Sequence, residues 1–237
     1  MNQLILDQNI FRRVEQKYLL TKNQYENLME CIKDSIEKDI YYESTISNIY
    51  FDTDNNDLII NSIEKPLYKN KIRLRSYSTP NLNSKVFLEI KIKYKGVVAK
   101  RRIDLTLEEF YEYMNSGNMP NSNKQIMNEI DYYFKKYNLK PKMFLAYDRL
   151  SYYDKNHKEF RITFDKNVRS REYDLKLEYG DYGKKYFDED IYIMELKTLG
   201  SIPLWFTQIL SKLKIYPQSF SKYGKIYSKK IEEEFYV

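Results

Sequence analysis

Three Glu-x-Lys triplets place an acid and a base at a spacing that could do chemistry. They are Glu15-Gln16-Lys17, Glu89-Ile90-Lys91 and Glu195-Leu196-Lys197, and Glu159-Phe160-Arg161 repeats the pattern with a guanidinium. Each lies in a segment whose pattern predicts a β-strand, and a strand places residues i and i+2 on the same face. Each triplet therefore points a carboxylate and a cation in one direction. Such pairs either meet bulk water or line a polar cavity, and the two cases predict different functions.

The strands that would position these triplets alternate between apolar and charged residues. They are predicted over residues 10–20, 45–52, 69–78, 85–94, 97–105, 142–153, 158–165, 167–178 and 190–198. Turns are predicted at 53–56, at Gly96 and around His157, and a polar loop over 180–188. An antiparallel sheet built from successive hairpins is the expected arrangement.

Helices are predicted between these strands. Capping boxes at Thr21 with Gln24 and at Thr106 with Glu109 mark two helix starts. Apolar residues at helical spacing carry the first helix as far as Ile36. The second runs to about residue 115, and others are predicted over 123–137, over 203–214 and from about 219.

The charged strand faces repeat arginine and glutamate at adjacent positions. A solvated outer face explains any one strand, but ordinary solvated faces use threonine and serine more freely. The whole set favours a barrel whose apolar outer face is covered by helices and whose inner face is charged. Unpaired buried charge is costly, so such a lumen needs a polyanion or metal ions. Arginine suits phosphate because its planar fork donates two hydrogen bonds at once.

Composition narrows the function classes. The 237 residues are 42% hydrophobic, and only six glycines and six prolines are present, which favours one compact domain over 1–237. Lys and Arg outnumber Asp and Glu by 40 to 34, and this balance favours anionic partners. No apolar run approaches the roughly 20 residues that span a bilayer. Residues 1–10 show no secretory signal, so a soluble, cytoplasmic protein is expected.

Two single residues exclude further chemistry. Cys31 is the one cysteine, so an internal disulfide is excluded; a buried structural thiol on the apolar side of the first helix is expected. His157, the one histidine, falls in a polar turn, which argues against a histidine metal site or a Ser/His/Asp triad.

Nine motifs, in order along the chain, match a known family. They are Phe11–Tyr18, Ile49–Thr53, Lys71–Tyr77, Phe87–Lys91, Lys100–Arg102, Tyr147–Arg149, Arg161–Asp165, Glu195–Lys197 and Ser221–Tyr223. With them the chain resembles the VTC (vacuolar transporter chaperone) domain, the polyphosphate polymerase branch of the triphosphate tunnel metalloenzymes. The resemblance implies an α+β fold: an antiparallel closed β-barrel tunnel of about eight strands, with a charged lumen and flanking helices.

The resemblance also implies a reaction and its residues. The reaction is metal-dependent transfer of the ATP γ-phosphate to a growing inorganic polyphosphate chain. The catalytic cations would be Lys17, Arg73, Arg75, Lys91, Arg149 and Arg161, and the further phosphate contacts Lys100, Arg102, Tyr147, Ser221 and Lys222. Glu195 matches the ligand of a divalent metal, Mn²⁺ or Mg²⁺. Glu15 and Glu89 would join it or orient the lysines beside them.

One departure bears on the reaction, and alternatives stay open. The wider superfamily begins with Glu-x-Glu-x-Lys, whereas Arg13 stands at the first position here, which favours holding a polyanion over two-metal hydrolysis. A tunnel-type triphosphatase and a non-catalytic polyphosphate-binding module are the alternatives. A basic sheet protein that binds nucleic acid or another protein is a weaker alternative. Its 25 tyrosines could stack on bases, but they fall mainly at strand and core positions. Threading product across a membrane would require a separate membrane partner.

Overall fold

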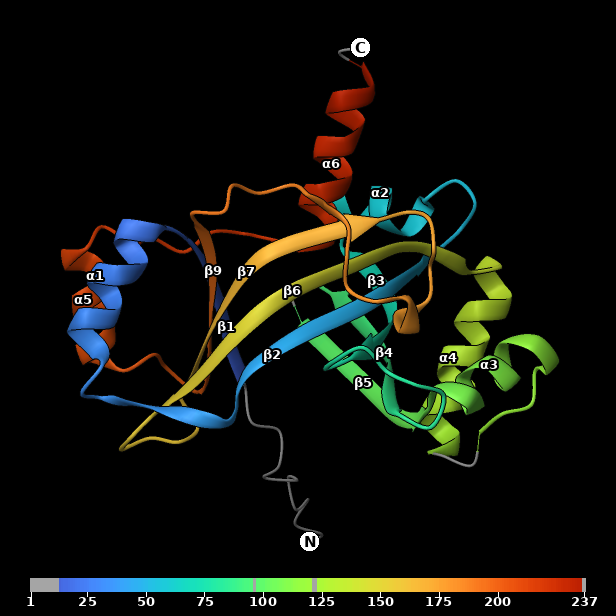
Figure 1. The fold of residues 1–237 in the computed structure, drawn as a ribbon, viewed down its shortest axis with the longest axis horizontal. Helices are drawn as coiled ribbons and strands as arrows, with labels where there is room; N and C mark the ends of the chain where they lie inside the picture. The colour runs from blue at the N-terminus through green and yellow to red at the C-terminus, as the bar shows by residue number, and fades with distance from the viewer. Residues whose placement is uncertain (1–12, 96, 121–122, 236–237) are drawn as a thin grey trace, which may run out of the picture. The chain divides into compact units, whose positions relative to one another are not determined.

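The computed structural model describes residues 13–95, 97–120 and 123–235, apart from the side chain of Arg13 (Figure 1). Its strands are β1 (Arg13–Thr21), β2 (Ile36–Asp52), β3 (Tyr68–Ser76), β4 (Lys85–Tyr94), β5 (Val97–Thr106), β6 (Lys140–Asp154), β7 (Arg161–Arg171), β8 (Lys184–Lys185) and β9 (Ile191–Leu199). Its helices are α1 (Lys22–Ile32), α2 (Asp57–Ile63), α3 (Leu107–Ser116), α4 (Lys124–Tyr137), α5 (Leu204–Lys212) and α6 (Lys222–Phe235), with a 3₁₀ turn at Leu177–Tyr179.

The nine strands form one sheet, in the order β1-β9-β7-β6-β2-β3-β4-β5 with β8 beside β7. The strand pairs with known register are antiparallel. The predicted α+β class and the antiparallel sheet are therefore confirmed. Within the described residues no hydrogen-bonded pairing joins β1 to β5, so the closed barrel stays a prediction.

Contacts divide the described chain into two compact units. Unit 1 comprises the described residues of 1–43, 149–166 and 188–220; unit 2 comprises those of 44–148, 167–187 and 221–237. Strands β2, β6 and β7 contribute residues to both units, because the boundaries fall inside them. The single domain expected from the sequence stays a prediction.

Unit 1 has its own hydrophobic core, in which α1 and α5 cover the apolar strand faces. Leu28 of α1 and Phe206 of α5 are fully buried with Leu20, Phe164 and Leu196 of the strands. The capping box of Thr21 and Gln24 begins α1 as predicted. That helix ends at Ile32, however, and Ile36 belongs to β2.

The expected burial of Cys31 is wrong, because the thiol is exposed. Leu28 and Ile32 are the fully buried residues of α1, and Tyr25 and Met29 pack against the same core. Successive residues of a helix are rotated by about 100°, so these four residues form one apolar face of α1 and Cys31 falls at the edge of that face, toward solvent.

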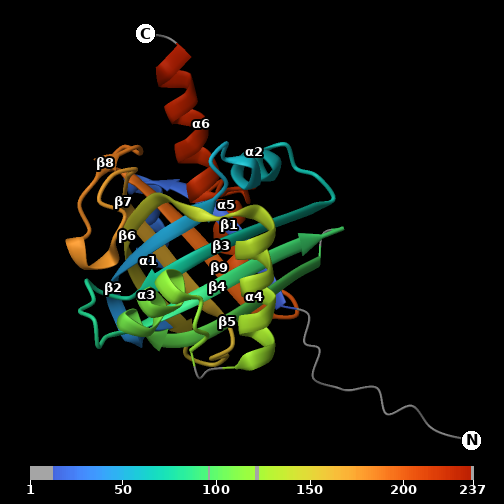
Figure 2. The same cartoon turned by 90° about the vertical axis from the view of Figure 1, so that its right-hand side faces the viewer.

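Unit 2 has a second core, formed by α3 and α4 against β3, β4 and β5 (Figure 2). Ile72, Ile90 and Ile103 of the strands bury their side chains with Phe110 and Ile130 of the helices. The capping box of Thr106 and Glu109 is confirmed. Arg101 interrupts the apolar side of β5, and its Nε donates to the Glu129 carboxylate of α4 at 2.8 Å.

Several strand bounds differ from the sequence predictions. Strand β2 begins at Ile36, where charged residues at successive positions hide the alternation. Strand β7 continues to Arg171, and residues 172–178 are not a strand. Glu159 lies in the turn before β7, so the fourth triplet is not on a strand face.

Some predictions fall on residues that lack a description. These are residues 1–12 and Gly96, although Tyr94 pairs with Val97 across the expected hairpin. Helix α2 was not predicted. None of the helices described is long and apolar enough to cross a bilayer.

Candidate functional site

The charged faces of β3, β4 and β5 meet around Glu89 in unit 2. Strand register sets Glu89 between Arg73 on β3 and Arg102 on β5. The opposite faces of these strands carry the buried isoleucines and leucines of the unit 2 core. Side-chain alternation therefore forces the three charged residues onto a shared face.

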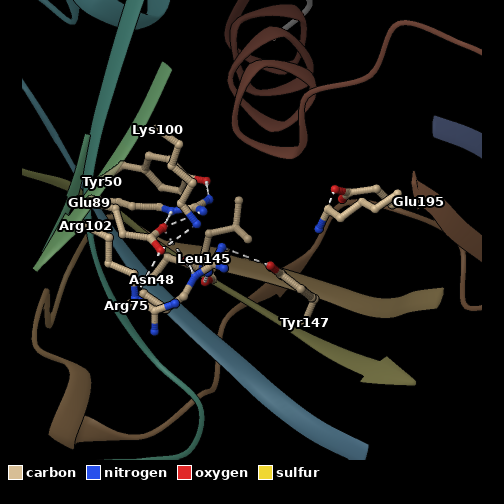
Figure 3. Close-up of polar contacts among 11 residues, drawn as sticks. Asn48, Tyr50, Arg75, Glu89, Lys100, Arg102, Leu145, Tyr147 and Glu195 are labelled. Atoms are coloured by element: carbon tan, nitrogen blue, oxygen red, sulfur yellow. Dashed lines mark hydrogen bonds and ion pairs between the residues drawn. The ribbon is translucent and has the colours of Figure 1, made fainter. Parts of the chain in front are cut away.

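Four cations surround the Glu89 carboxylate, whose side chain is only 2% exposed (Figure 3). Arg73 Nη2 lies 2.7 Å and Lys100 Nζ 2.8 Å from its oxygens. Arg102 Nε follows at 3.8 Å and Arg75 Nε at 3.9 Å. Four cations around one carboxylate leave an excess of three positive charges.

These charges shift one another's pKa. Burial alone would raise the pKa of Glu89, but Arg73, Arg75 and Lys100 outweigh it and hold that pKa well below its usual range. Burial opposes charge on Arg73, yet Tyr50 and Glu89 keep its pKa raised. Burial lowers the pKa of Lys100 to about 8, since the attraction of Glu89 only partly offsets burial and the two arginines. The cluster therefore holds fixed guanidinium charges beside one lysine that titrates near neutrality.

Polar side chains missed by the sequence reasoning fix the two arginines. Arg75 Nε donates to Asn48 Oδ1 at 2.9 Å, and Asn48 Nδ2 donates to the Leu145 carbonyl at 3.0 Å. Arg73 Nη1 donates to the Tyr50 hydroxyl at 3.1 Å. Asn48 is fully buried in the otherwise largely apolar half of β2. That polar interruption is the signal that could have identified it.

The start of α6 contributes the last predicted contacts of unit 2. Lys222 Nζ lies 4.4 Å from the centre of the Tyr147 ring, and the Tyr147 hydroxyl accepts from Arg75 Nη2 at 3.3 Å. Ser221 Oγ accepts from Lys71 Nζ at 2.7 Å and from the Gly224 amide at 3.2 Å. Lys91 lies opposite both Lys71 and Lys100 in the strand register. Unit 2 thus brings together Arg73, Arg75, Glu89, Lys91, Lys100, Arg102, Tyr147, Ser221 and Lys222.

In unit 1 the other two triplets pair with each other. Strand register sets Glu15 opposite Lys197 and Lys17 opposite Glu195. Within the triplets, Lys17 Nζ lies 3.6 Å from Glu15, and Lys197 Nζ lies 2.8 Å from Glu195. Lys17 Nζ also donates to the Phe220 carbonyl at 3.3 Å. The result is a two-by-two arrangement of alternating charges on one strand face.

The two remaining predicted arginines are matched by carboxylates. Arg149 donates from Nε and Nη2 to the two oxygens of Asp165, at 2.6 and 2.8 Å. Arg161 pairs with Asp39 and is 46% exposed. Sequence reasoning did not identify either aspartate as a partner. Both arginines are thus more nearly neutralised than the cations around Glu89.

The carboxylates of unit 1 have the chemistry of a divalent metal site shared with a substrate. Mg²⁺ and Mn²⁺ prefer oxygen ligands, and Mg²⁺ is usually held by one or two carboxylates plus phosphate oxygens. Glu15 and Glu195 lie diagonally to each other on paired strands. Across the described residues no group of three or more acids, histidines or cysteines gathers for a metal. These residues fit a metal held together with phosphate, and do not form an all-protein cage.

The fold and site define an α+β protein whose antiparallel sheet carries one strongly charged face. The chain belongs to the VTC domain family, which matches residues 12–229. This membership confirms the resemblance carried by the nine motifs. No curated protein matches the chain.

One solved structure shows the same fold at low sequence identity, and a second is similar over most of its length. A “putative adenylate cyclase” from Bacillus halodurans is 16% identical, with a TM-score of 0.55 over 88% of this chain and 93% of that one. The PH1819 protein of Pyrococcus horikoshii OT3 is 15% identical, with a TM-score of 0.49 over 93% and 98%. At such identities the likeness concerns the fold alone.

Proposed function

We propose that the chain is a polyphosphate polymerase, which transfers the γ-phosphate of ATP to a growing inorganic polyphosphate chain. The observation that carries the proposal is the excess of positive charge around Glu89, in a chain of the VTC family. Cations packed around one buried carboxylate repel one another, and a polyanion relieves that repulsion. A linear phosphate chain carries the negative charge that this strand face would attract.

The arginines are held in position before any ligand arrives. The hydrogen bonds of Arg75 to described residues use Nε and Nη2, which leaves the two Nη1 donors for phosphate oxygens. Phosphoryl transfer requires alignment and charge neutralisation more than covalent help. Arg73, Arg75, Lys100 and Arg102 would supply both, and Tyr147, Ser221 and Lys222 would orient the phosphates near α6.

The remaining predicted residues belong to the same proposal. Lys17, Lys91, Arg149 and Arg161 would contact phosphates, and Glu195 with Glu15 would hold Mn²⁺ or Mg²⁺. A bound divalent ion neutralises phosphate oxygens while charge moves to the leaving group. Glu89 is better suited to orienting cations than to binding a metal, because four cations already face its carboxylate. The proposal also includes a closed barrel, since a closed barrel would surround the phosphate chain with cations.

The reaction is tested by incubating the purified protein with ATP and Mn²⁺ and sizing the phosphate products on a gel. The proposal expects long polyphosphate together with ADP. Orthophosphate and ADP without polymer would make the protein a triphosphatase. Binding of polyphosphate without turnover of ATP would make it a binding module. Either outcome overturns the polymerase.

The metal assignment has its own variant. Glu195→Gln keeps the shape but removes the charge, so synthesis should fall by about 100-fold or more. Glu159→Gln is the matched control, because Glu159 is an exposed glutamate in a turn. Full synthesis by Glu195→Gln would contradict the assignment of the metal to Glu195.

A further inference from the structure

The charged face of β3 and β4 continues beyond Glu89 as a row of lysines. Strand register sets Lys71 opposite Lys91 and, at the next rung, Lys69 opposite Lys93. Like charges directly opposite each other destabilise an antiparallel pair. The sequence thus places lysine against lysine twice, toward the end of the strands where β4 turns into β5.

Among the described residues, no carboxylate offsets the charge of the outer pair, Lys69 and Lys93. Throughout the described part of the chain, no acidic side chain forms an ion pair with Lys69, Lys93 or the nearby Lys65. Lys69 Nζ donates to a backbone carbonyl, that of Ser62, at 3.1 Å. Burial lowers the pKa of Lys69, and Lys93 and Lys65 lower it further. The charges of Lys93 and Lys65 therefore lie close enough to Lys69 to repel its ammonium group.

The opposite end of β4 is arranged differently. Lys85 lies on the same face of the same strand, and its Nζ forms an ion pair with Asp104 Oδ2 at 2.9 Å. One end of this strand face is thus neutralised, and the other carries positive charge alone. Solvation of the whole strand face does not explain this difference in charge between its two ends.

We propose that a polyphosphate chain bound at the Glu89 cluster runs along β3 and β4 toward the β4–β5 hairpin, where Lys69 and Lys93 bind its distal phosphates (Figure 2). The inference rests on the proposed function and adds the direction of the chain and a subsite for its far end. The lysine pair lies four residues from the Arg73–Glu89 rung, about 13 Å along the strands. This distance exceeds the length of a triphosphate, so only a longer chain reaches both places.

An anionic lipid surface is the competing occupant. Leu67, Tyr94 and Val97 are exposed at the same end of the strands, and apolar residues beside lysines also suit a membrane surface. The register favours phosphate, because Lys69 and Lys93 share their strand face and alignment with Arg73 and Lys91. The experiment therefore includes both ligands.

The test compares the double variant Lys69→Gln, Lys93→Gln with the control Lys85→Gln. Titration calorimetry would measure the binding of tripolyphosphate and of long-chain polyphosphate to each. In the double variant the Kd for the long chain should rise about tenfold and its salt dependence should weaken, because two phosphate contacts are lost. Tripolyphosphate affinity should stay within about twofold in all proteins, since the lost charges lie beyond its reach.

Three outcomes would overturn the subsite. One is an unchanged long-chain affinity in the double variant, and another is an equal loss for both ligands. The third is a double variant that loses binding to anionic vesicles alone, which would assign the lysines to a lipid surface. Failure of the proposed function is distinguishable, because it appears in the synthesis assay of the unaltered protein with ATP and Mn²⁺, whereas failure of the subsite appears in the comparison of long-chain binding between the variants. Thermal unfolding should show an unchanged or higher Tm for the double variant, since the substitutions remove repulsion.

Discussion

Lys100 is the cation around Glu89 whose charge can change under ordinary conditions. Its lowered pKa of about 8 means that the ammonium form dominates below that pH and is lost above it. The arginines beside it stay charged throughout this range. A phosphate ligand favours the charged form, so binding and protonation of Lys100 are linked.

The affinity for tripolyphosphate should therefore fall as pH rises from 7 to 9.5. The fall approaches tenfold per pH unit above about 8, and at pH 8 binding should take up about half a proton. Calorimetry in buffers of different ionisation enthalpy measures both quantities. Lys100→Arg is the matched variant, because its guanidinium stays charged, and dividing the two affinities cancels the titration of the ligand. An identical pH profile in both proteins would show that Lys100 does not contact the phosphate.

Strand parity predicted which charged residues share a face, because alternation is a local property of the sequence. It did not predict which carboxylate neutralises which cation. Glu89 and Glu195 occur in the same Glu-x-Lys pattern, yet four cations surround Glu89. Glu195 instead pairs with Lys197 and lies opposite Lys17 of the neighbouring strand β1. Those environments depend on strand order and register, which bring distant residues together.

At the scale of elements, two of the predicted helices carry a local capping signal in the sequence. Thr21 and Thr106 lie at the N-cap positions of α1 and α3 and accept from the residue three positions later. Helix α2 has no such signal: its N-cap residue Asn56 is left-handed and its side chain makes no cap hydrogen bond. The capping acceptor is Asp52, at the end of β2. Because this acceptor lies four residues before the N-cap residue, a capping motif that begins at the N-cap residue does not detect it.

Asp52→Asn should therefore destabilise the protein by about 2 kcal/mol. Asp52 Oδ1 accepts from the Leu58 amide at 2.8 Å and Oδ2 from the Ile59 amide at 2.9 Å. An asparagine has one acceptor oxygen, so in either orientation its NH₂ group faces a backbone N–H. Urea denaturation followed by circular dichroism measures the loss.

The control for this substitution lies in the same helix. Asp57→Asn makes the same chemical change at an exposed residue of the first turn of α2. Its effect should stay below about 1 kcal/mol, because the hydrogen bond that Thr53 Oγ1 donates to Asp57 Oδ2 at 2.6 Å is exposed to solvent. Equal losses from the two variants would mean that Asp52 has no special capping role.

At the scale of the whole molecule, the chain has two hydrophobic cores but not two consecutive domains. The core of unit 1 lies under α1 and α5, and that of unit 2 under α3 and α4. Composition and the scarcity of glycine and proline indicated one body, and periodicity located most elements. Neither indicates how the core divides, because the boundaries of the two units fall inside the long strands β2, β6 and β7.

Because these three strands contribute to both units without a break, we expect the described chain to unfold in a single cooperative transition. Trp205, the one tryptophan, lies in unit 1 and reports on that unit by fluorescence. Ile130 is fully buried in the unit 2 core, so Ile130→Ala should cost about 3 kcal/mol. If the units are coupled, the midpoint of the Trp205 fluorescence transition shifts to a lower denaturant concentration by the same amount as the midpoint measured by circular dichroism of the whole chain.

The control is Asn128→Ala, at an exposed position of the same helix, which should leave both midpoints unchanged. A Trp205 transition that stays in place while circular dichroism splits into two steps would show that the units fold independently.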